Sequence, residues 1–369
     1  MPRFLQLHLL TTYPAANLNR DDTGRPKTVL FGGAERLRIS SQSLKRAFRT
    51  SAVFADGLPG ALGTRSQAFA GALVDALVAR GLTREDAVAR AEAVITVAKL
   101  GKVKKGAVAL TEQLVHLGPD ELEAIAGLAE RMAQPDALEE KSILVLKDKP
   151  RAADIAMFGR MLADNPVHNI EAAVQVAHAF TTHRAVVEDD YYTAVDDIKN
   201  ADQAADRGAG FIGVQEFGAG LFYLYICVDA GLLLDNLAGD AALAADAVAA
   251  LVRAATTVSP GGKQNAYASR AKARYALLET GDEAPRSLAG AFQLPVGARP
   301  GEADQYQESV ARLTALRDGF RRAYDEDLAS HVMDVDDPGS ASLADLIAAA
   351  RAAVTDAAAS APATARAGA

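Results

Sequence analysis

A short basic stretch near the N-terminus carries the side chains best suited to binding a ligand. No acidic residue occurs between Arg36 and Ala55, and the spacing of apolar residues predicts a helix from Ser40 or Ser41 to about Ala55. One face of that helix is polar and basic, because four residues follow the spacing i, i+3, i+4, i+7: Gln42, Lys45, Arg46 and Arg49. The opposite stripe is apolar: Leu44, Ala47 and Phe48. Serine hydroxyls and free backbone N–H groups at the helix start add donors for an anion. The pattern predicts a phosphate site, with a solvated basic face as the alternative.

Residues 15–34 are rich in Asn, Asp, Gly and Pro and predict a long loop that adds three cations to this site: Arg20, Arg25 and Lys27. Gly32 and Gly33 would let a ligand approach the backbone closely, although paired glycines more often mark a turn. The spacing of a nucleotide P-loop is absent. Asp21 and Asp22 could bind Mg²⁺, but beside a cation they fit loop solvation or salt bridging better.

Charge is divided unevenly along the chain. The 369 residues carry a formal net charge of −8, yet residues 1–50 hold nine basic and three acidic side chains, a net of +6, which leaves −14 for the remainder. Such asymmetry indicates a localised anion site. Half of the residues are hydrophobic, which excludes a disordered, highly charged chain.

The common motifs of catalytic and metal sites do not occur in this sequence. The six histidines do not cluster, and the spacing of His178 and His183 makes no metal pair on a strand or on a helix. A single cysteine, Cys227, excludes a disulfide framework and a cysteine zinc cluster, and it fits a reducing compartment. The apolar runs are too short to span a bilayer. We therefore expect a cytoplasmic protein without cofactor, metal ion or catalytic residues.

The basic stretch has to be positioned by a mixed fold. A strand with one buried face is predicted at Leu5–Leu9, ending at Pro14, and a second strand at Arg36–Ile39. Further strands are predicted at residues 155–158, 174–182, 221–228 and 273–278. Helices are predicted at residues 241–256, at 302–318, from 342 onward, and about four times within the Ala-rich stretch 60–140. This order predicts an α+β fold with an antiparallel sheet and helices on one face.

Two further segments could contact nucleic acid. Residues 188–220 form a polar, glycine-rich arm that carries Phe211, Ile212 and Phe217. Bulky apolar side chains on such an arm can insert between bases and unstack them, or they can dock on the protein's own core. A cluster of lysines lies at a turn of the Ala-rich stretch: Lys99, Lys102, Lys104 and Lys105.

The motifs LNRDD, FGG and RLRISSQSLKRAFR, followed by AHAFTTH, YTAVDD and GVQEF, resemble the CasC family, the repeated backbone subunit of the type I-E CRISPR surveillance complex Cascade. The resemblance covers nearly the whole chain up to about residue 330. It implies an RRM-like (ferredoxin-like) antiparallel-sheet palm, a helical fingers insertion and a β-hairpin thumb. The implied bounds are palm at 1–58, 146–187 and 221–341, fingers at 59–145, thumb at 188–220, and an Ala-rich C-terminal helix and tail at 342–369.

The same resemblance implies a non-catalytic scaffold that polymerises along CRISPR RNA, holds its backbone and displays segments for pairing with target DNA in antiviral defence. The implied partners are CRISPR RNA, target DNA, copies of the chain itself, and other Cascade subunits: the guide 5′-end capping subunit, the large and small subunits and the guide-processing endonuclease. The implied RNA-binding residues are Arg20, Lys27, Ser40, Gln42, Lys45, Arg46, Arg49, Lys263 and Gln264. The thumb wedge would be the segment Phe211 to Gln215, with Phe211, Ile212 and Gln215 as its named members. The lysines at 99–105 are candidates for contacting DNA.

Two alternatives remain open. Related backbone subunits of other CRISPR types cleave RNA with a loop aspartate, so Asp21 or Asp22 could make this chain a metal-dependent endoribonuclease that cleaves guide-paired RNA. The lack of a partnering His or Lys arrangement argues against that function. A purely structural helical protein would carry no nucleic acid at all.

Overall fold

The computed structural model describes residues 3–104, 109–132, 145–194, 211–297 and 304–360. Nine antiparallel strands form the main sheet, with the path β11-β10-β1-β9-β7-β3-β2 and with β6 and β8 also paired to β9. The strands run as follows: β1 Phe4–Ala16, β2 Thr28–Phe31, β3 Ala34–Ile39, β6 Val174–Val176, β7 Ala179–Thr181, β8 Glu188–Ala194, β9 Phe211–Asp229, β10 Tyr275–Gly281 and β11 Ala329–Asp334. The expected α+β class with an antiparallel sheet is confirmed.

The strand β1 lies between β9 and β10, with Leu7 opposite Ile226 on one side and Leu278 on the other. Leu5, Leu7 and Leu9 pack in the core beneath the helices α9 (Ala241–Thr257) and α12 (Leu343–Ser360). The smaller helices α1 (Ser41–Arg49), α2 (Ala52–Asp56), α6 (Ala153–Phe158) and α8 (Ala230–Asn236) belong to the same layer.

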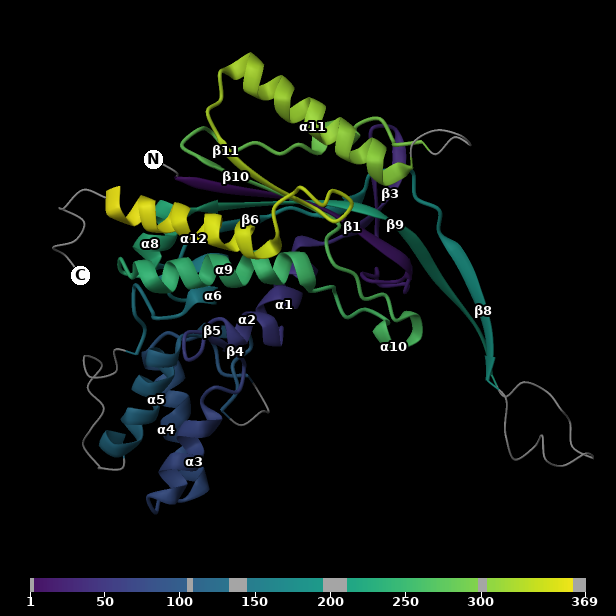
Figure 1. Ribbon diagram of the computed structural model, residues 1–369. Coiled ribbons are helices and arrows are strands. Elements are labelled where there is room, and N and C mark those ends of the chain that lie inside the picture. Colours follow the sequence, from purple (N-terminus) through teal and green to yellow (C-terminus); the bar gives the residue numbers. More distant parts are fainter. Residues whose placement is uncertain (1–2, 105–108, 133–144, 195–210, 298–303, 361–369) are drawn as a thin grey trace, which may run out of the picture.

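The expectation that β1 has one buried face is wrong, because both faces are covered. On the second face lie α11 (Gln305–Tyr324) and the short 3-10 helix η3 (Ala289–Phe292), over a core that includes Tyr223, Phe292 and Leu313 (Figure 1). Gln6 and His8 point into this layer and are fully buried. One polar atom of each has a partner there: His8 Nδ1 lies 2.9 Å from the Tyr223 hydroxyl, and the Tyr225 hydroxyl donates to Gln6 Oε1 at 3.0 Å.

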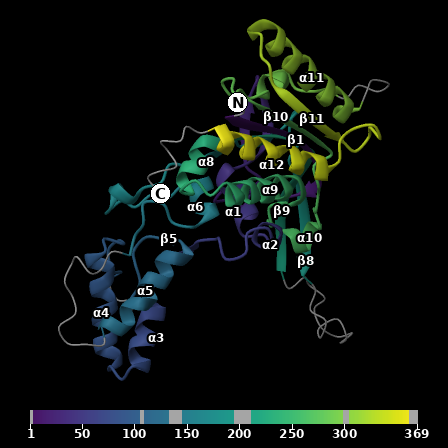
Figure 2. The same cartoon turned by 60° about the vertical axis from the view of Figure 1, so that its left-hand side comes forward.

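Residues 64–132 contain a separate helical lobe, which is made of α3 (Gly71–Ala79), α4 (Arg84–Val97) and α5 (Pro119–Met132) with the two-stranded sheet of β4 (Thr64–Ser66) and β5 (Val115–Leu117). The lobe has a hydrophobic core of its own. It projects away from the main sheet, and the hairpin of β8 and β9 projects in another direction (Figures 1 and 2). Three helices are present in the described part of the stretch for which about four are expected.

Several expected boundaries are wrong. Residues 155–158 form the helix α6 rather than a strand, because a short apolar run has no period that separates a buried helix from a buried strand. The strand β1 continues past Pro14 to Ala16 through a bulge or irregularity in its pairing with β9 between Tyr13 and Ala16, and a bulge accommodates proline within a strand. The helix expected to reach Ala55 is broken after Arg49, where Ser51 Oγ accepts from Phe54 N and starts α2.

The stretch expected to be one long loop contains β2 and a tight turn into β3. Gly32 and Gly33 make that turn with φ of +59° and +73°. A β-carbon on Gly32 would overlap the carbonyl oxygen of Gln293. The backbone that approaches Gly32 closely is therefore the protein's own, and the turn interpretation of this glycine pair is the correct one.

Candidate nucleic-acid interface

The helix α1 presents the basic face that its spacing predicts. Leu44 and Phe48 are buried in the core, whereas Gln42 and Arg46 are exposed and Lys45 and Arg49 are half-buried. Ser40 caps the helix, because its Oγ accepts from Ser43 N at 3.2 Å. The hydroxyl oxygen of Ser40 is thus already engaged within the protein, while Ser41 and Gln42 begin the outward face.

A hollow of about 560 Å³ lies along this face, and all four predicted residues line it. Its other wall comes from the helical lobe, from the last residue of α6 and from the segment that follows it: Arg65, Leu114, His116, Phe158, Gly159, Arg160, Met161, Ile170 and Ala172. We call this hollow the basic cleft. Its volume and its mixture of cations with apolar side chains suit a nucleic-acid strand better than a small anion.

Three residues of the basic cleft are not predictable from the sequence. Arg65 is an isolated exposed cation on β4, Leu114 is 51% exposed and Met161 is 82% exposed. Each comes from a segment far from α1 in the chain, so no local spacing connects it with the basic stretch. Only their exposure in the folded chain marks the two apolar side chains as available to a base.

The loop that carries Arg20 and Lys27 is hydrogen-bonded to the start of α1. Asn19 Oδ1 accepts from Ser40 N at 2.8 Å, and Lys27 N donates to Asn19 O at 2.8 Å. Arg20 is exposed and Lys27 is half-buried. These bonds place two of the predicted cations beside the N-terminus of α1, where its backbone N–H groups also favour an anion.

The electrostatic potential at the N-terminus of α1 is positive, and its effect is seen on the pKa of His178. Its Nδ1 accepts from Ser41 N at 2.9 Å and lies 3.3 Å from Arg38 Nη1. Burial lowers the pKa of His178, and the charges of Arg38, Lys27 and Lys45 lower it further. Cations from the loop, from β3 and from α1 therefore all lie close to His178 at the start of α1. Such a concentration of positive charge favours the binding of an anion there.

Arg36 belongs to the same basic stretch but has no access to a ligand. Its side chain is fully buried. Its guanidinium donates to the carbonyl oxygens of Thr181 (3.0 Å), Thr182 (2.6 Å) and Phe292 (2.9 Å). It therefore joins β3 to the end of β7, to the residue that follows it and to η3. Arg36 contributes to folding rather than to the basic cleft.

A family model described as CT1975-like protein matches residues 5–359. The chain belongs to this family. The resemblance to the CasC family drawn from the sequence motifs is confirmed. A solved chain described as "CRISPR RNA-guided surveillance complex, pre-nicking" is 31% identical with a TM-score of 0.81, over 95% of this chain and 100% of that one. Another, described as "CRISPR RNA-guided surveillance complex", is 28% identical with a TM-score of 0.60, over 96% and 99%. A search of curated proteins returned no match.

The arm predicted at residues 188–220 contains a hairpin in which β8 pairs with the first part of β9 over Glu188–Ala194 and Phe211–Phe217. Phe211 and Ile212 are each 56% exposed, and Gln215 is half-buried. Phe217 instead stacks on Tyr267 with ring centroids 5.8 Å apart. Phe211 and Ile212 are therefore available to a ligand, whereas Phe217 docks on the chain itself. Residues 195–210 lie outside the described residues.

Lys263 and Gln264 lie beside the start of the loop that carries Arg20 and Lys27. Gly262 packs so closely on the carbonyl oxygens of Asn17 and Leu18 that a β-carbon would overlap them. Lys263 has a φ of +53°, and Gln264 Nε2 donates to Ser269 O at 3.3 Å. Both residues remain candidates for backbone contacts, since they are half-buried next to the start of the loop.

The remaining predicted residues lie apart from the basic cleft. Lys99, Lys102 and Lys104 are exposed on the helical lobe and do not line the cleft, and Lys105 lies outside the described residues.

Asp21 Oδ1 accepts from Thr23 N, Thr23 Oγ1 and Arg25 N, and the Thr23 hydroxyl is the main cause that lowers the pKa of Asp21. No group of three or more potential metal ligands occurs among the described residues. None of the helices described is long and apolar enough to cross a membrane.

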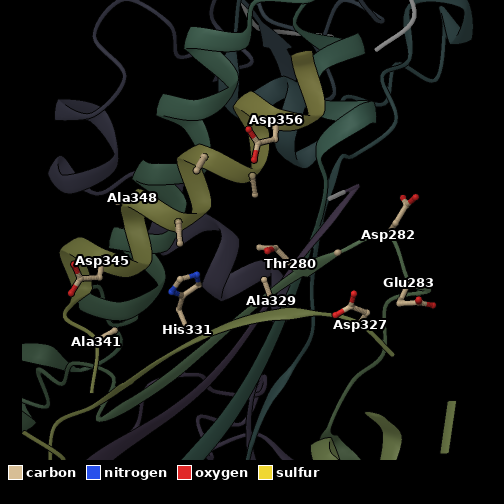
Figure 3. Close-up of a pocket in the computed structure, with 14 residues that line it drawn as sticks. Thr280, Asp282, Glu283, Asp327, Ala329, His331, Ala341, Asp345, Ala348 and Asp356 are labelled. Atoms are coloured by element: carbon tan, nitrogen blue, oxygen red, sulfur yellow. The ribbon is translucent and has the colours of Figure 1, made fainter. Parts of the chain in front are cut away.

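A second hollow, of about 1130 Å³, lies between α12 and the edge strand β11 (Figure 3). Its floor is formed largely by alanines of α12, and five acidic residues line it: Asp282, Glu283, Asp327, Asp345 and Asp356. None of its lining residues is Lys or Arg. This acidic hollow repels phosphate, so the basic cleft is the better candidate for a nucleic-acid interface.

Proposed function

We propose that this protein is a non-catalytic, guide RNA-binding backbone subunit of a Cascade-type CRISPR surveillance complex. The observation that carries the proposal is the convergence of Gln42, Lys45, Arg46 and Arg49 from α1 with Arg65 of the helical lobe on one cleft. The loop with Arg20 and Lys27 extends the same positive surface past the helix start. Membership of the family and likeness to surveillance-complex chains support this reading.

The guide RNA is held by its backbone. Lysine and arginine side chains attract phosphates whatever the base, so the bound strand keeps its sequence available for pairing with target DNA. The apolar side chains of Met161 and Leu114 at the cleft offer contact area to bases without hydrogen-bond readout. The protein thus positions the strand, and base pairing supplies the specificity.

The β8–β9 hairpin acts as the thumb. It projects from the sheet and exposes Phe211 and Ile212. Inserting such side chains between neighbouring bases costs stacking energy and displaces a nucleotide locally. The lobe of residues 64–132 corresponds to the fingers, and the main sheet with its helices corresponds to an RRM-like palm.

Copies of the chain associate along one RNA. When one surface of each chain binds a different surface of the next, the same contact repeats from copy to copy. If the rotation between neighbouring copies does not close a ring, the assembly is a helical filament. The other implied partners are target DNA and the remaining Cascade subunits. The lysines Lys99, Lys102 and Lys104 on the fingers are available to the DNA strand.

The proposal is tested by co-expressing the chain with a CRISPR array and sizing both the protein and its bound RNA. We expect several copies of the chain on one RNA of guide length. A monomer that carries no nucleic acid would overturn the proposal and would favour a purely structural helical protein.

The absence of catalysis is tested on the assembled complex. Incubation with RNA complementary to the guide and Mg²⁺ is expected to leave that RNA intact, because Asp21 Oδ1 accepts three hydrogen bonds from Thr23 and Arg25 within its own loop. Periodic cuts that disappear in Asp21→Ala or Asp22→Ala would instead establish the endoribonuclease.

A further inference from the structure

A buried carboxylate lies behind the basic cleft. Asp154, on α6, is fully buried. Its Oδ1 accepts from Gly63 N at 2.7 Å. Its Oδ2 lies 2.9 Å from His116 Nε2 and 3.6 Å from Arg49 Nη1. One side chain therefore contacts three segments that are far apart in the sequence.

These three segments are the parts from which the cleft is built. Arg49 is in the last turn of α1 and lines the cleft. Gly63 directly precedes β4, the strand that carries Arg65, and His116 is in β5, which pairs with β4. Asp154 thus connects the basic face of α1 with the wall of the cleft that the helical lobe provides.

Charge explains why Arg49 is held there. A buried carboxylate is costly unless a cation and hydrogen-bond donors compensate it. Among the groups found to contact Asp154, the guanidinium of Arg49 is the one that is always charged. A guanidinium has five N–H donors, so an arginine that contacts a carboxylate through one nitrogen keeps others for a phosphate.

We propose that Asp154 is a positioning residue for guide RNA: its carboxylate, held in place by its contacts with Gly63 and His116, orients the Arg49 guanidinium toward the cleft. The side chain of Arg49 is only 18% exposed, so its direction is set by the buried carboxylate that it contacts rather than by solvent. The inference rests on the proposed function, because it concerns how an RNA-binding cation is oriented.

A second buried ion pair serves as a matched control. Arg160 Nη1 contacts both carboxylate oxygens of Glu121, at 2.8 and 2.7 Å, and both side chains are at most 1% exposed. This pair also fastens α5 of the lobe to the segment after α6. Arg160 lines the cleft too, but the pair involves no residue of α1. Weakening it perturbs the attachment of the lobe without acting on Arg49.

The test is a double-mutant cycle on RNA affinity, measured with the full chain and a guide RNA of fixed sequence. We expect Arg49→Ala and Asp154→Asn each to weaken binding by about tenfold. In the double variant the losses should not multiply, because Asp154 acts through Arg49. Glu121→Gln combined with Arg49→Ala should give losses that multiply. Urea unfolding establishes that each variant is folded under the binding conditions.

Asp154→Glu, which keeps the negative charge, is expected to recover most of the affinity that Asp154→Asn loses. If Asp154→Asn does not fold, the cycle is run with Asp154→Glu, whose shifted carboxylate predicts a smaller loss that again vanishes in the Arg49→Ala background. Losses that multiply for Asp154 and Arg49 would overturn the inference. An Arg49→Ala variant with unchanged affinity would instead remove Arg49 from the proposed RNA site.

Discussion

Two arginines of one basic stretch have different roles because the fold buries one of them. Arg36 is fully buried and donates to three backbone carbonyls, whereas Arg46 is exposed at the basic cleft. The sequence predicts the outward position of Arg46, since helix periodicity is local. It does not predict the burial of Arg36, because the acceptors come from residues 181, 182 and 292. Counting the basic residues of the sequence therefore overestimates the number of cations that a ligand can reach.

A buried polar network beneath α11 makes stability depend on pH. Burial alone would raise the pKa of Glu279, but hydrogen bonds from His8 and Arg286, with the charge of Arg286, outweigh it and hold this pKa at about 2 instead of the usual 4.5. A lowered carboxyl pKa contributes stability that is complete above about 4.5 and is lost as the pH falls toward 2. Burial also lowers the pKa of His8 below 6.5, so protonation of the unfolded state begins to cost stability below that pH.

Glu279→Gln is therefore expected to lower the free energy of unfolding at pH 7 by on the order of 3 kcal/mol. Its stability should decline less than that of the wild type between pH 4.5 and 2, while the decline between pH 6.5 and 4.5 that belongs to His8 persists. Urea unfolding at a series of pH values measures both. An equal decline of the two proteins below pH 4.5 would contradict the assigned pKa of Glu279.

Helices and strands with a full period are predictable from this sequence, and short apolar runs are not. The spacing in α1 places Leu44 and Phe48 in the core and the polar residues at the cleft, as observed. Residues 155–158 are apolar throughout and lie in a helix that buries Ile155, Ala156 and Met157, where the sequence predicts a strand. This error hides the position of Asp154, which on a helix faces both α1 and the lobe.

The exposed apolar tip of the β8–β9 hairpin is expected to distort the bound RNA. Replacing Phe211 and Ile212 together by alanine should leave folding unchanged, because both side chains are exposed. Guide RNA should still bind, since the cations hold its backbone. The periodic local distortion of the RNA should disappear, because the wedge that unstacks the bases is gone.

Acylation of RNA 2′-hydroxyls in the assembled complex measures that distortion. Leu294→Ala is the matched control, because Leu294 is an exposed apolar residue (73%) outside the hairpin. It should leave the reactivity pattern as in the wild type. A periodic pattern that survives in the Phe211→Ala/Ile212→Ala variant would contradict the role of the hairpin as a wedge.

For the whole molecule, the distribution of charge is more informative than its total. The net charge of −8 suggests a protein that avoids nucleic acid, but residues 1–50 carry +6. In the part of the chain that the structure describes, cations line the basic cleft and acidic residues line the hollow between α12 and β11. The sequence predicts the positive half of the cleft, because α1 and its loop are adjacent in the chain. It does not predict the lobe half, because Arg65 and Leu114 reach the cleft only through the packing of an insertion.

The salt dependence of guide RNA affinity tests the central claim most directly. For the wild type the logarithm of affinity should fall linearly with the logarithm of salt concentration, because phosphate binding releases counterions. Lys45→Ala/Arg49→Ala should bind any guide sequence more weakly and should show a slope shallower by roughly 1.4, at about 0.7 for each lost contact with a single strand.

The control, Arg253→Ala/Arg322→Ala, removes two exposed cations outside the basic cleft and should keep the wild-type slope. The account predicts a reduced affinity and a shallower slope for the cleft variant alone. A cleft variant that retains both the affinity and the slope of the wild type would contradict it.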